Sequence, residues 1–151
     1  MAANNAGSTG STGSTGSVGR VGRVGRVAPA AALTDRRRIG REAEDRAARM
    51  LCAAGLRILH RNYRCRMGEL DIVARDSAVV VVVEVRLRST PRFGGAAASI
   101  TAAKRRRIIL ATRHLLARFP SLQQAALRFD AVLVDAPHGR IEWLQDAFDA
   151  P

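Results

Sequence analysis

Residues 68–88 read GELDIVARDSAVVVVVEVRLR and carry the strongest strand signal in the chain. Residues 69–74 and 79–87 are rich in β-branched side chains, which favour strands. Residues 75–78 (RDSA) lie between them and can form a turn. The pattern therefore predicts two neighbouring strands joined by a short connection.

The segments on either side predict an α/β fold. A helix begins at Thr34, a suitable N-cap, and ends at Gly55. A short strand covers 56–60, a loop 91–95, a second helix 97–119, and two further strands 129–134 and 140–144. The order of helix, three strands, helix and two strands predicts a mixed sheet flanked by helices.

The first 33 residues differ from the rest. Ser-Thr-Gly repeats pass into Val-Gly-Arg repeats, a composition that cannot bury enough apolar surface to offset the entropy of ordering. We therefore expect a disordered low-complexity tail over 1–33 and a single domain over 34–151.

The chain is strongly basic. It has 25 Lys and Arg against 13 Asp and Glu, and a formal net charge of +12. This charge predicts attraction to polyanions, nucleic acid first and acidic lipid surfaces second. Only one of the 25 is lysine, so a coding bias toward arginine explains part of the excess.

The compartment is predicted to be the cytoplasm. The longest apolar run, residues 78–83, is too short to cross a bilayer, so no membrane association is expected. The two cysteines have neither CxxC spacing nor histidines arranged as in a zinc site, which suits a reducing compartment.

Carboxylates interrupt the central strands. Side chains alternate between the faces of a strand, so Glu69 and Asp71 share one face. A hairpin centred between Asp76 and Ser77 would set Glu69 opposite Glu84 and make Asp71 a diagonal neighbour of Glu84. A register shifted by one residue would instead separate the two acids.

Two such carboxylates repel each other, and burying them is costly without a cation. Oxygen ligands with no soft ligand nearby predict Mg²⁺ or Mn²⁺, which would orient a phosphate and acidify an attacking water. The alternative is that these acids pair with arginines at a solvated strand edge. Glu84 weakens that alternative because it interrupts a valine-rich strand.

The helices add further candidates, each with an alternative. Glu44 lies at the edge of the first helix's buried stripe, where it can face the sheet or remain an exposed acid. Lys104 lies on one stripe with Ile100, Ile108, Ala111 and Leu115, so it either extends to solvent or meets an anion. Arg105, Arg106 and Arg107 form a basic cluster suited to phosphates, or a solvated face.

Several motifs together resemble the YraN-like family, uncharacterised protein family 0102. They are Gly40-x-x-x-Glu44, Asn62-Tyr63-Arg64, Gly68-Glu69-Leu70-Asp71, Val83-Glu84-Val85-Arg86, Arg88, Phe93-Gly94-Gly95, Lys104 and Arg128-Phe129-Asp130. The match covers about residues 38–148, and the combination is more specific than any one motif.

The resemblance implies a restriction-endonuclease-like fold, shared with archaeal Holliday-junction resolvases. By that similarity Asp71 and Glu84 would be metal ligands, with the Val85 carbonyl as a third. Glu44 would correspond to the helix-borne acid of the resolvases, and Arg86 occupies the position of the signature lysine.

That arginine is a departure from the nucleases of this fold. Arg86 stays protonated and cannot act as a base, although it can hold a phosphate and stabilise transition-state charge. Lys104 would then supply the missing ammonium. The residues expected to contact nucleic acid are Arg64, Arg88, Arg105, Arg106 and Arg107.

Three functions remain open at this point. The first is a Mg²⁺-dependent endonuclease that hydrolyses DNA phosphodiesters, in branched or single-stranded DNA. The second is a non-catalytic nucleic-acid-binding module of the same fold, and the third is a protein-interaction scaffold. The aromatic content of 4% argues against base stacking, so backbone contacts should dominate. The resolvase resemblance also suggests a homodimer.

Overall fold

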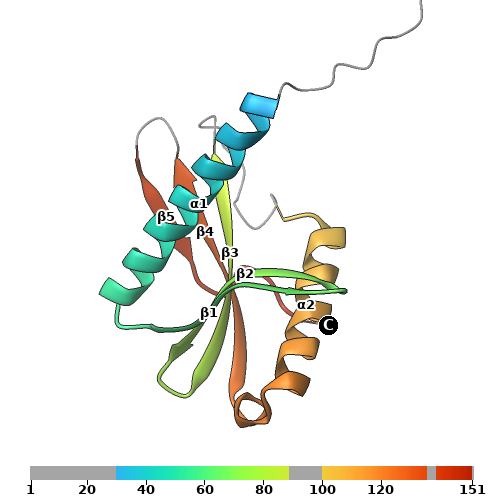
Figure 1. Cartoon of the computed structure of the whole chain (residues 1–151). Coiled ribbons are helices and arrows are strands. Elements are labelled where there is room, and N and C mark those ends of the chain that lie inside the picture. The colour runs from blue at the N-terminus through green and yellow to red at the C-terminus, as the bar shows by residue number, and fades with distance from the viewer. Residues whose placement is uncertain (1–29, 89–99, 136–138, 151) are drawn as a thin grey trace, which may run out of the picture.

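The computed structural model describes residues 30–88, 100–135 and 139–150. Of the tail predicted over 1–33, residues 1–29 lie outside these ranges, as does the loop 91–95, whereas residues 30–33 belong to the first helix. The elements are α1 (Ala30–Ala53), β1 (Arg57–Cys65), β2 (Gly68–Asp76), β3 (Val79–Arg88), α2 (Ala102–Arg118), η2 (Pro120–Leu122), β4 (Ala126–Asp135) and β5 (Ile141–Leu144) (Figure 1). The fold class is therefore α/β, as predicted.

The strands form one mixed sheet in the order β1-β2-β3-β4-β5. Only β3 and β4 run parallel, and the chain between them passes through α2. The other neighbouring pairs are antiparallel. This topology puts β3 in the centre and β1 and β5 at the edges.

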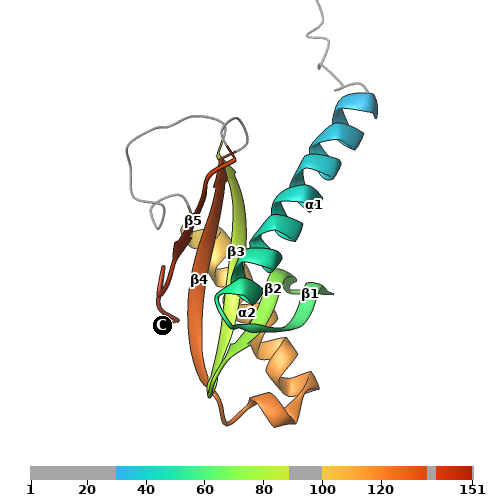
Figure 2. The same cartoon turned by 90° about the vertical axis from the view of Figure 1, so that its left-hand side faces the viewer.

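The two helices cover opposite faces of the sheet (Figure 2). Val80 and Val82 of β3 belong to the core beneath α2, whereas Val81 and Val83 belong to the core beneath α1. A strand covered on both sides has no solvated face, which explains the unbroken valine run. The predicted apolar stripe is buried between α2 and the sheet; it consists of Ile100, Ile108, Ala111 and Leu115.

The bounds of several elements differ from the prediction, most clearly at α1, α2 and β1. Helix α1 begins at Ala30, so Thr34 lies inside it and is not its N-cap. Thr101 caps α2, whose first helical residue is Ala102. Strand β1 extends to Cys65 because its polar residues tolerate an edge position, where pairing with β2 satisfies the backbone.

Neither described helix combines the length and the apolar character needed to span a bilayer.

Candidate functional site

The pairing of β2 with β3 sets two acids directly side by side. The prediction centred this hairpin one residue too early: Asp76 pairs with Val79, so residues 77–78 form the turn. Continuing the ladder outward places Asp71 opposite Glu84 rather than diagonal to it. The partner of Glu84 is thus Asp71 instead of the predicted Glu69, a shift of two residues. Side chains alternate between the faces of a strand with a period of two, so this shift leaves both acids on the predicted face.

Both acids lie on the face that α2 covers. Val73 lies two residues after Asp71, and Val82 lies two residues before Glu84. Both valines belong to the core beneath α2. Asp71 and Glu84 share that face by alternation. Glu84 is only 5% exposed, and Asp71 is half-buried. The acidic pair therefore lies at the edge of the core that α2 covers.

Burial and like charge act together on Asp71. Its Oδ2 accepts a hydrogen bond from the Val85 N–H at 2.9 Å. Desolvation nevertheless raises the pKa of Asp71 from 3.8 to about 7, and the adjacent charge of Glu84 adds to the rise. The Val85 N–H and the Lys104 ammonium oppose it. When no metal ion is bound, the carboxyl of Asp71 therefore holds its proton up to about neutral pH.

Helix α2 brings a lysine to the pair. The Thr101 hydroxyl accepts from the Lys104 N–H at 3.3 Å, which places Lys104 in the first turn. Because it shares a stripe with the buried Ile108, its side chain turns toward the sheet. The Lys104 Nζ lies 3.1 Å from Glu84 Oε2. Of the two predicted environments, the structure has the one in which this lysine meets an anion.

Arg86 completes the group from the strand itself. It is two residues after Glu84 on the same strand face, and its guanidinium lies 3.8 Å from Glu84 Oε1. The Arg86 side chain remains 40% exposed. This leaves a cation at the mouth of the site that can reach a ligand from solvent.

Glu44 does not join this group. It lies on α1, where its Oε2 accepts from the Asn62 side-chain amide at 2.9 Å. No cluster of three or more acidic, His or Cys side chains suited to a metal occurs within the described ranges. The structure thus brings Asp71, Glu84, Arg86 and Lys104 together and places Glu44 apart.

A basic hollow of about 360 Å³ opens beside Lys104. Arg64 and Arg107 line it with Lys104, and Gly68 and Glu69 at the start of β2 also border it. A Cβ on Gly68 would stand 3.1 Å from the Arg107 carbonyl oxygen. Glycine therefore permits the close approach of this strand to α2 that forms the hollow.

The other predicted phosphate-binding residues have different surroundings. Arg106 is exposed on α2. The Arg105 Nε donates to the Ile100 carbonyl at 3.0 Å, and its guanidinium stacks over Phe148. Arg88 pairs with Glu142 of β5 at 3.3 Å. Of these three, only Arg106 has no contact of this kind within the described part of the chain.

A second acidic centre has no role in the sequence prediction. Asp130 is completely buried in β4. Its carboxylate accepts from the Arg128 Nε at 2.9 Å, the Trp143 Nε1 at 3.0 Å and the Asp146 N–H at 3.0 Å. Arg128 also bonds Asp76 at 3.2 Å. The sequence did contain a signal for this buried network: Asp130 interrupts an otherwise apolar strand two residues after Arg128.

The sequence comparisons give the family. The sequence model described as "Uncharacterised protein family UPF0102" matches residues 43–134. This chain belongs to the UPF0102 family. A UPF0102 protein of Dechloromonas aromatica is 54% identical over 111 residues, covering 74% of this chain and 88% of that protein. One of Methylobacillus flagellatus is 50% identical over 115 residues, covering 76% and 99% respectively.

The residues matched to UPF0102 contain the whole acidic site. Asp71, Glu84, Arg86 and Lys104 all lie between residues 43 and 134, as does Glu44. The basic first half of α1 precedes the match, and β5 follows it. The names of these UPF0102 relatives state no activity, so function has to be argued from the site.

The Asp71 pKa predicts how stability depends on pH in metal-free solution. The folded protein holds this proton up to about pH 7, whereas the unfolded chain releases it near pH 3.9. This contribution is fully present below about pH 4 and is lost as pH rises through 7. We expect the free energy of unfolding to fall by up to about 3 kcal/mol between about pH 5 and pH 8.

Urea unfolding in EDTA, compared between wild type and Asp71→Asn, measures this term. The comparison removes the pH-dependent contributions that both proteins share. The prediction fails if both proteins lose the same stability between the two pH values.

Proposed function

We propose that this protein is a divalent-metal-dependent nuclease that hydrolyses phosphodiesters of nucleic acid. The observation that carries the proposal is the pairing of Asp71 with Glu84 on a largely buried face, with Lys104 and Arg86 beside them. Structural acids on a strand rarely lie opposite each other, because like charges there destabilise the sheet.

The donor set suits a divalent cation. Asp71 and Glu84 offer carboxylate oxygens from neighbouring strands, and the pKa of Asp71 is raised by burial and then by the charge of Glu84, both of which a bound cation would offset. Mg²⁺ binds through one or two carboxylates and retains several waters, and Mn²⁺ accepts the same ligands. Asp71 and Glu84 would hold the ion, which would supply positive charge toward a phosphate and a more acidic water.

The chain's own cations have separate tasks. Arg86 cannot take a proton from water, but its planar guanidinium can hold two oxygens of a phosphate and stabilise the charge that develops there. Lys104 neutralises Glu84 in the absence of substrate. From that position the ammonium can orient Glu84 or donate a hydrogen bond to a phosphate oxygen.

One observation favours a second candidate, a nucleic-acid-binding module without turnover. The Lys104 ammonium at 3.1 Å already compensates Glu84, and a protonated Asp71 carries no charge. The pair can therefore exist without a metal. In this case the basic surfaces would bind nucleic acid and the acids would be structural.

Cleavage assays separate the two candidates. Wild type is incubated with branched, flap and single-stranded DNA in Mg²⁺, in Mn²⁺ and in EDTA, with Asp71→Asn in parallel. The nuclease proposal expects cleavage by wild type that depends on metal. Tight binding of these DNAs by wild type with no metal-dependent cleavage of any of them would select the binding module.

Replacing Lys104 with alanine tests the ammonium. If Lys104 stabilises the transition state, cleavage should fall by roughly 100-fold, the cost of removing one preorganised donor. Lys104→Arg retains the positive charge but not the compact shape of the ammonium, so its cleavage rate should fall less. A Lys104→Ala protein that cleaves at the wild-type rate would remove this residue from the mechanism, and the rates of all three are compared under single-turnover conditions.

A further inference from the structure

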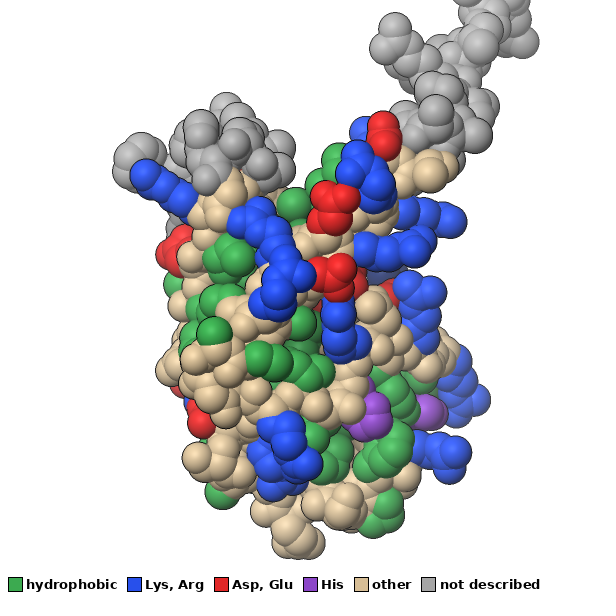
Figure 3. All heavy atoms as spheres, turned by 60° about the vertical axis from the view of Figure 1, so that its left-hand side comes forward, with side chains coloured by type: hydrophobic (Ala, Val, Ile, Leu, Met, Phe, Trp, Pro, Cys, Tyr) green, Lys and Arg blue, Asp and Glu red, His purple; other side chains and the backbone are tan. Residues whose placement is uncertain are grey.

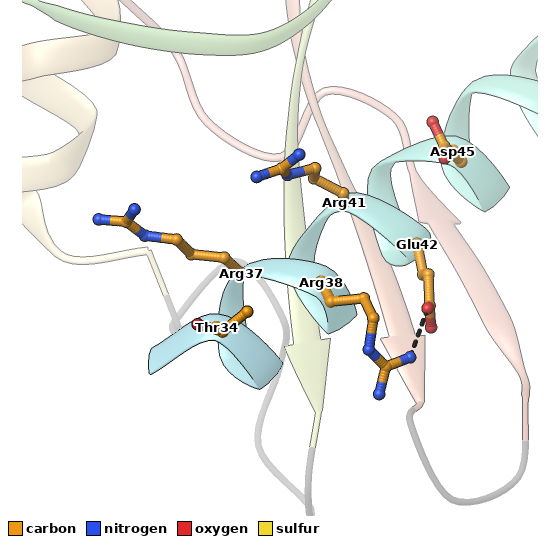
Figure 4. A pocket seen from close by; sticks show the side chains of 6 residues that line it. All are labelled: Thr34, Arg37, Arg38, Arg41, Glu42 and Asp45. Carbon is orange, nitrogen blue, oxygen red and sulfur yellow. Dashed lines mark hydrogen bonds and ion pairs between the residues drawn. The ribbon is translucent and has the colours of Figure 1, made fainter. Parts of the chain in front are cut away.

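Arg37 and Arg41 of α1 lie outside the site and, like Arg36, have no hydrogen-bond or ion-pair partner among the described residues. Figure 4 shows Arg37 and Arg41 extending from the same side of the helix, away from the Arg38–Glu42 ion pair. Both are exposed, and neither has an ion pair with another described residue. In contrast, Arg38 contacts Glu42 at 2.7 Å. The free guanidiniums are therefore directed to one side of α1.

These arginines line a hollow between α1 and β1 of about 470 Å³. The lining residues are Arg37, Gly40, Arg41, Glu44, Asn62 and Arg64. Three guanidiniums and one carboxylate line it. Arg64 already pairs with Glu69 at 3.0 Å, and Asn62 donates a hydrogen bond to Glu44, so the uncompensated charge comes from the two arginines of α1. The hollow is large enough for more than one phosphate group and has a net positive charge.

Gly40 gives an independent indication of a ligand. A glycine inside a helix costs about 1 kcal/mol relative to alanine. Packing offers no reason for it here, because a Cβ at Gly40 would meet no protein atom within 4 Å. The open space in front of Gly40 belongs to the hollow. A helix backbone left bare beside arginines permits close approach of a ligand.

The hollow continues toward the acidic pair. Arg64 of β1 lines both this hollow and the one beside Lys104. Since Lys104 contacts Glu84, a chain of cations runs from α1 across the end of β1 to the candidate site. Figure 3 shows Lys and Arg side chains gathered over α1 and the adjoining surface. Such a path fits an extended polyanion better than an isolated phosphate.

We infer that Arg37, Arg41 and Arg64 bind the sugar–phosphate backbone of a nucleic-acid strand that continues to the Asp71–Glu84 pair. This inference rests on the proposed function, because it extends the same substrate to a second place on the protein. An anionic membrane fits less well, since membrane-binding helices place large apolar side chains beside their basic ones. None of the residues lining this hollow has a large apolar side chain.

The test compares two double variants with equal charge changes. Arg37→Gln/Arg41→Gln removes the free pair, and Arg36→Gln/Arg38→Gln removes two arginines from other positions of the same helix. Affinity for a labelled duplex and a labelled single strand is measured in EDTA over a range of salt concentrations. Each lost phosphate contact lowers the slope of log affinity against log salt by about 0.9 for duplex or about 0.7 for single strand.

For Arg37→Gln/Arg41→Gln we expect the slope to fall by about 1.8 or 1.4 respectively, with at least a roughly tenfold loss of affinity at low salt. The control double variant should change the slope by less than half as much. Gly40→Gln alters no charge and improves helix propensity, yet its side chain would fill the hollow. It should weaken binding roughly tenfold without lowering the thermal stability.

Equal slopes for the two double variants, or unchanged affinity in Gly40→Gln, would overturn the inference while nucleic-acid binding itself stands. A wild type that binds neither duplex nor single strand would overturn the proposed function as well. Vesicles of phosphatidylglycerol and phosphatidylcholine provide a third probe. Vesicle binding that Arg37→Gln/Arg41→Gln abolishes, with nucleic-acid binding unaffected, would assign the arginines to a membrane and also reject the inference.

Discussion

Under the proposed nuclease function, replacing Asp71 with asparagine is expected to abolish metal-dependent cleavage of nucleic acid while binding persists. The amide has nearly the same shape, and its oxygen can still accept the Val85 N–H. It carries no charge, so it cannot replace the carboxylate opposite Glu84. Loss of a group that only supports a metal ligand costs roughly 10–100-fold. Loss of a ligand itself should therefore exceed about 100-fold, measured as the single-turnover rate in Mn²⁺.

Two further variants make this result specific. Glu84→Gln should behave like Asp71→Asn, since the two acids form one site. Asp76→Asn is the matched control: it makes the same change on the same strand, at a carboxylate that contacts Arg128 instead. Its activity should remain within about twofold of wild type, since a partly exposed ion pair contributes little. Equal losses in Asp71→Asn and Asp76→Asn would refute a special role for Asp71.

Replacing Asp130 with alanine is expected to give the largest loss of stability. This carboxylate is completely buried and accepts hydrogen bonds from Arg128, Trp143 and the Asp146 backbone. Removing it leaves these donors without their shared acceptor, and Arg128 keeps only Asp76 as a charge partner. Breaking a buried charge pair from one side costs about 3–5 kcal/mol. The melting temperature should fall by about 10 °C or more.

Thermal and urea unfolding measure this effect. Asp149→Ala is the control, because it removes an exposed acid near the C-terminus. Asp130→Asn should lie between wild type and Asp130→Ala, because the amide retains one acceptor and loses the charge. A change below about 1 kcal/mol in Asp130→Ala would mean that water satisfies the three donors equally well.

Periodicity alone was sufficient for the classes and order of the main elements. The valine run of β3 and the apolar stripe of α2 are local signals, and each determines which side chains share a face. For the same reason the alternation placed Asp71 and Glu84 on one face although the predicted turn was one residue early. An error of two residues in register leaves the face unchanged.

The position of Lys104 was predictable only in part. Its stripe left two environments open, solvent or an anion, and the structure has the second, with Glu84 as the anion. Its partner was not deducible, because the distance between Lys104 and Glu84 depends on how α2 lies across the strands. A stripe defines the face of a helix but not the residues on the facing strand.

The α/β class, the acids of the central strands and the basic character of the chain all follow from local sequence. Packing of the helices on the sheet was needed to show that Glu44 bonds Asn62 away from the acidic pair, that Asp130 accepts from Trp143, and that Arg64 borders two hollows. Each of these relations connects segments that are distant along the chain or on different elements. Local periodicity carries no information about such distances, because they arise only when the helices pack on the sheet.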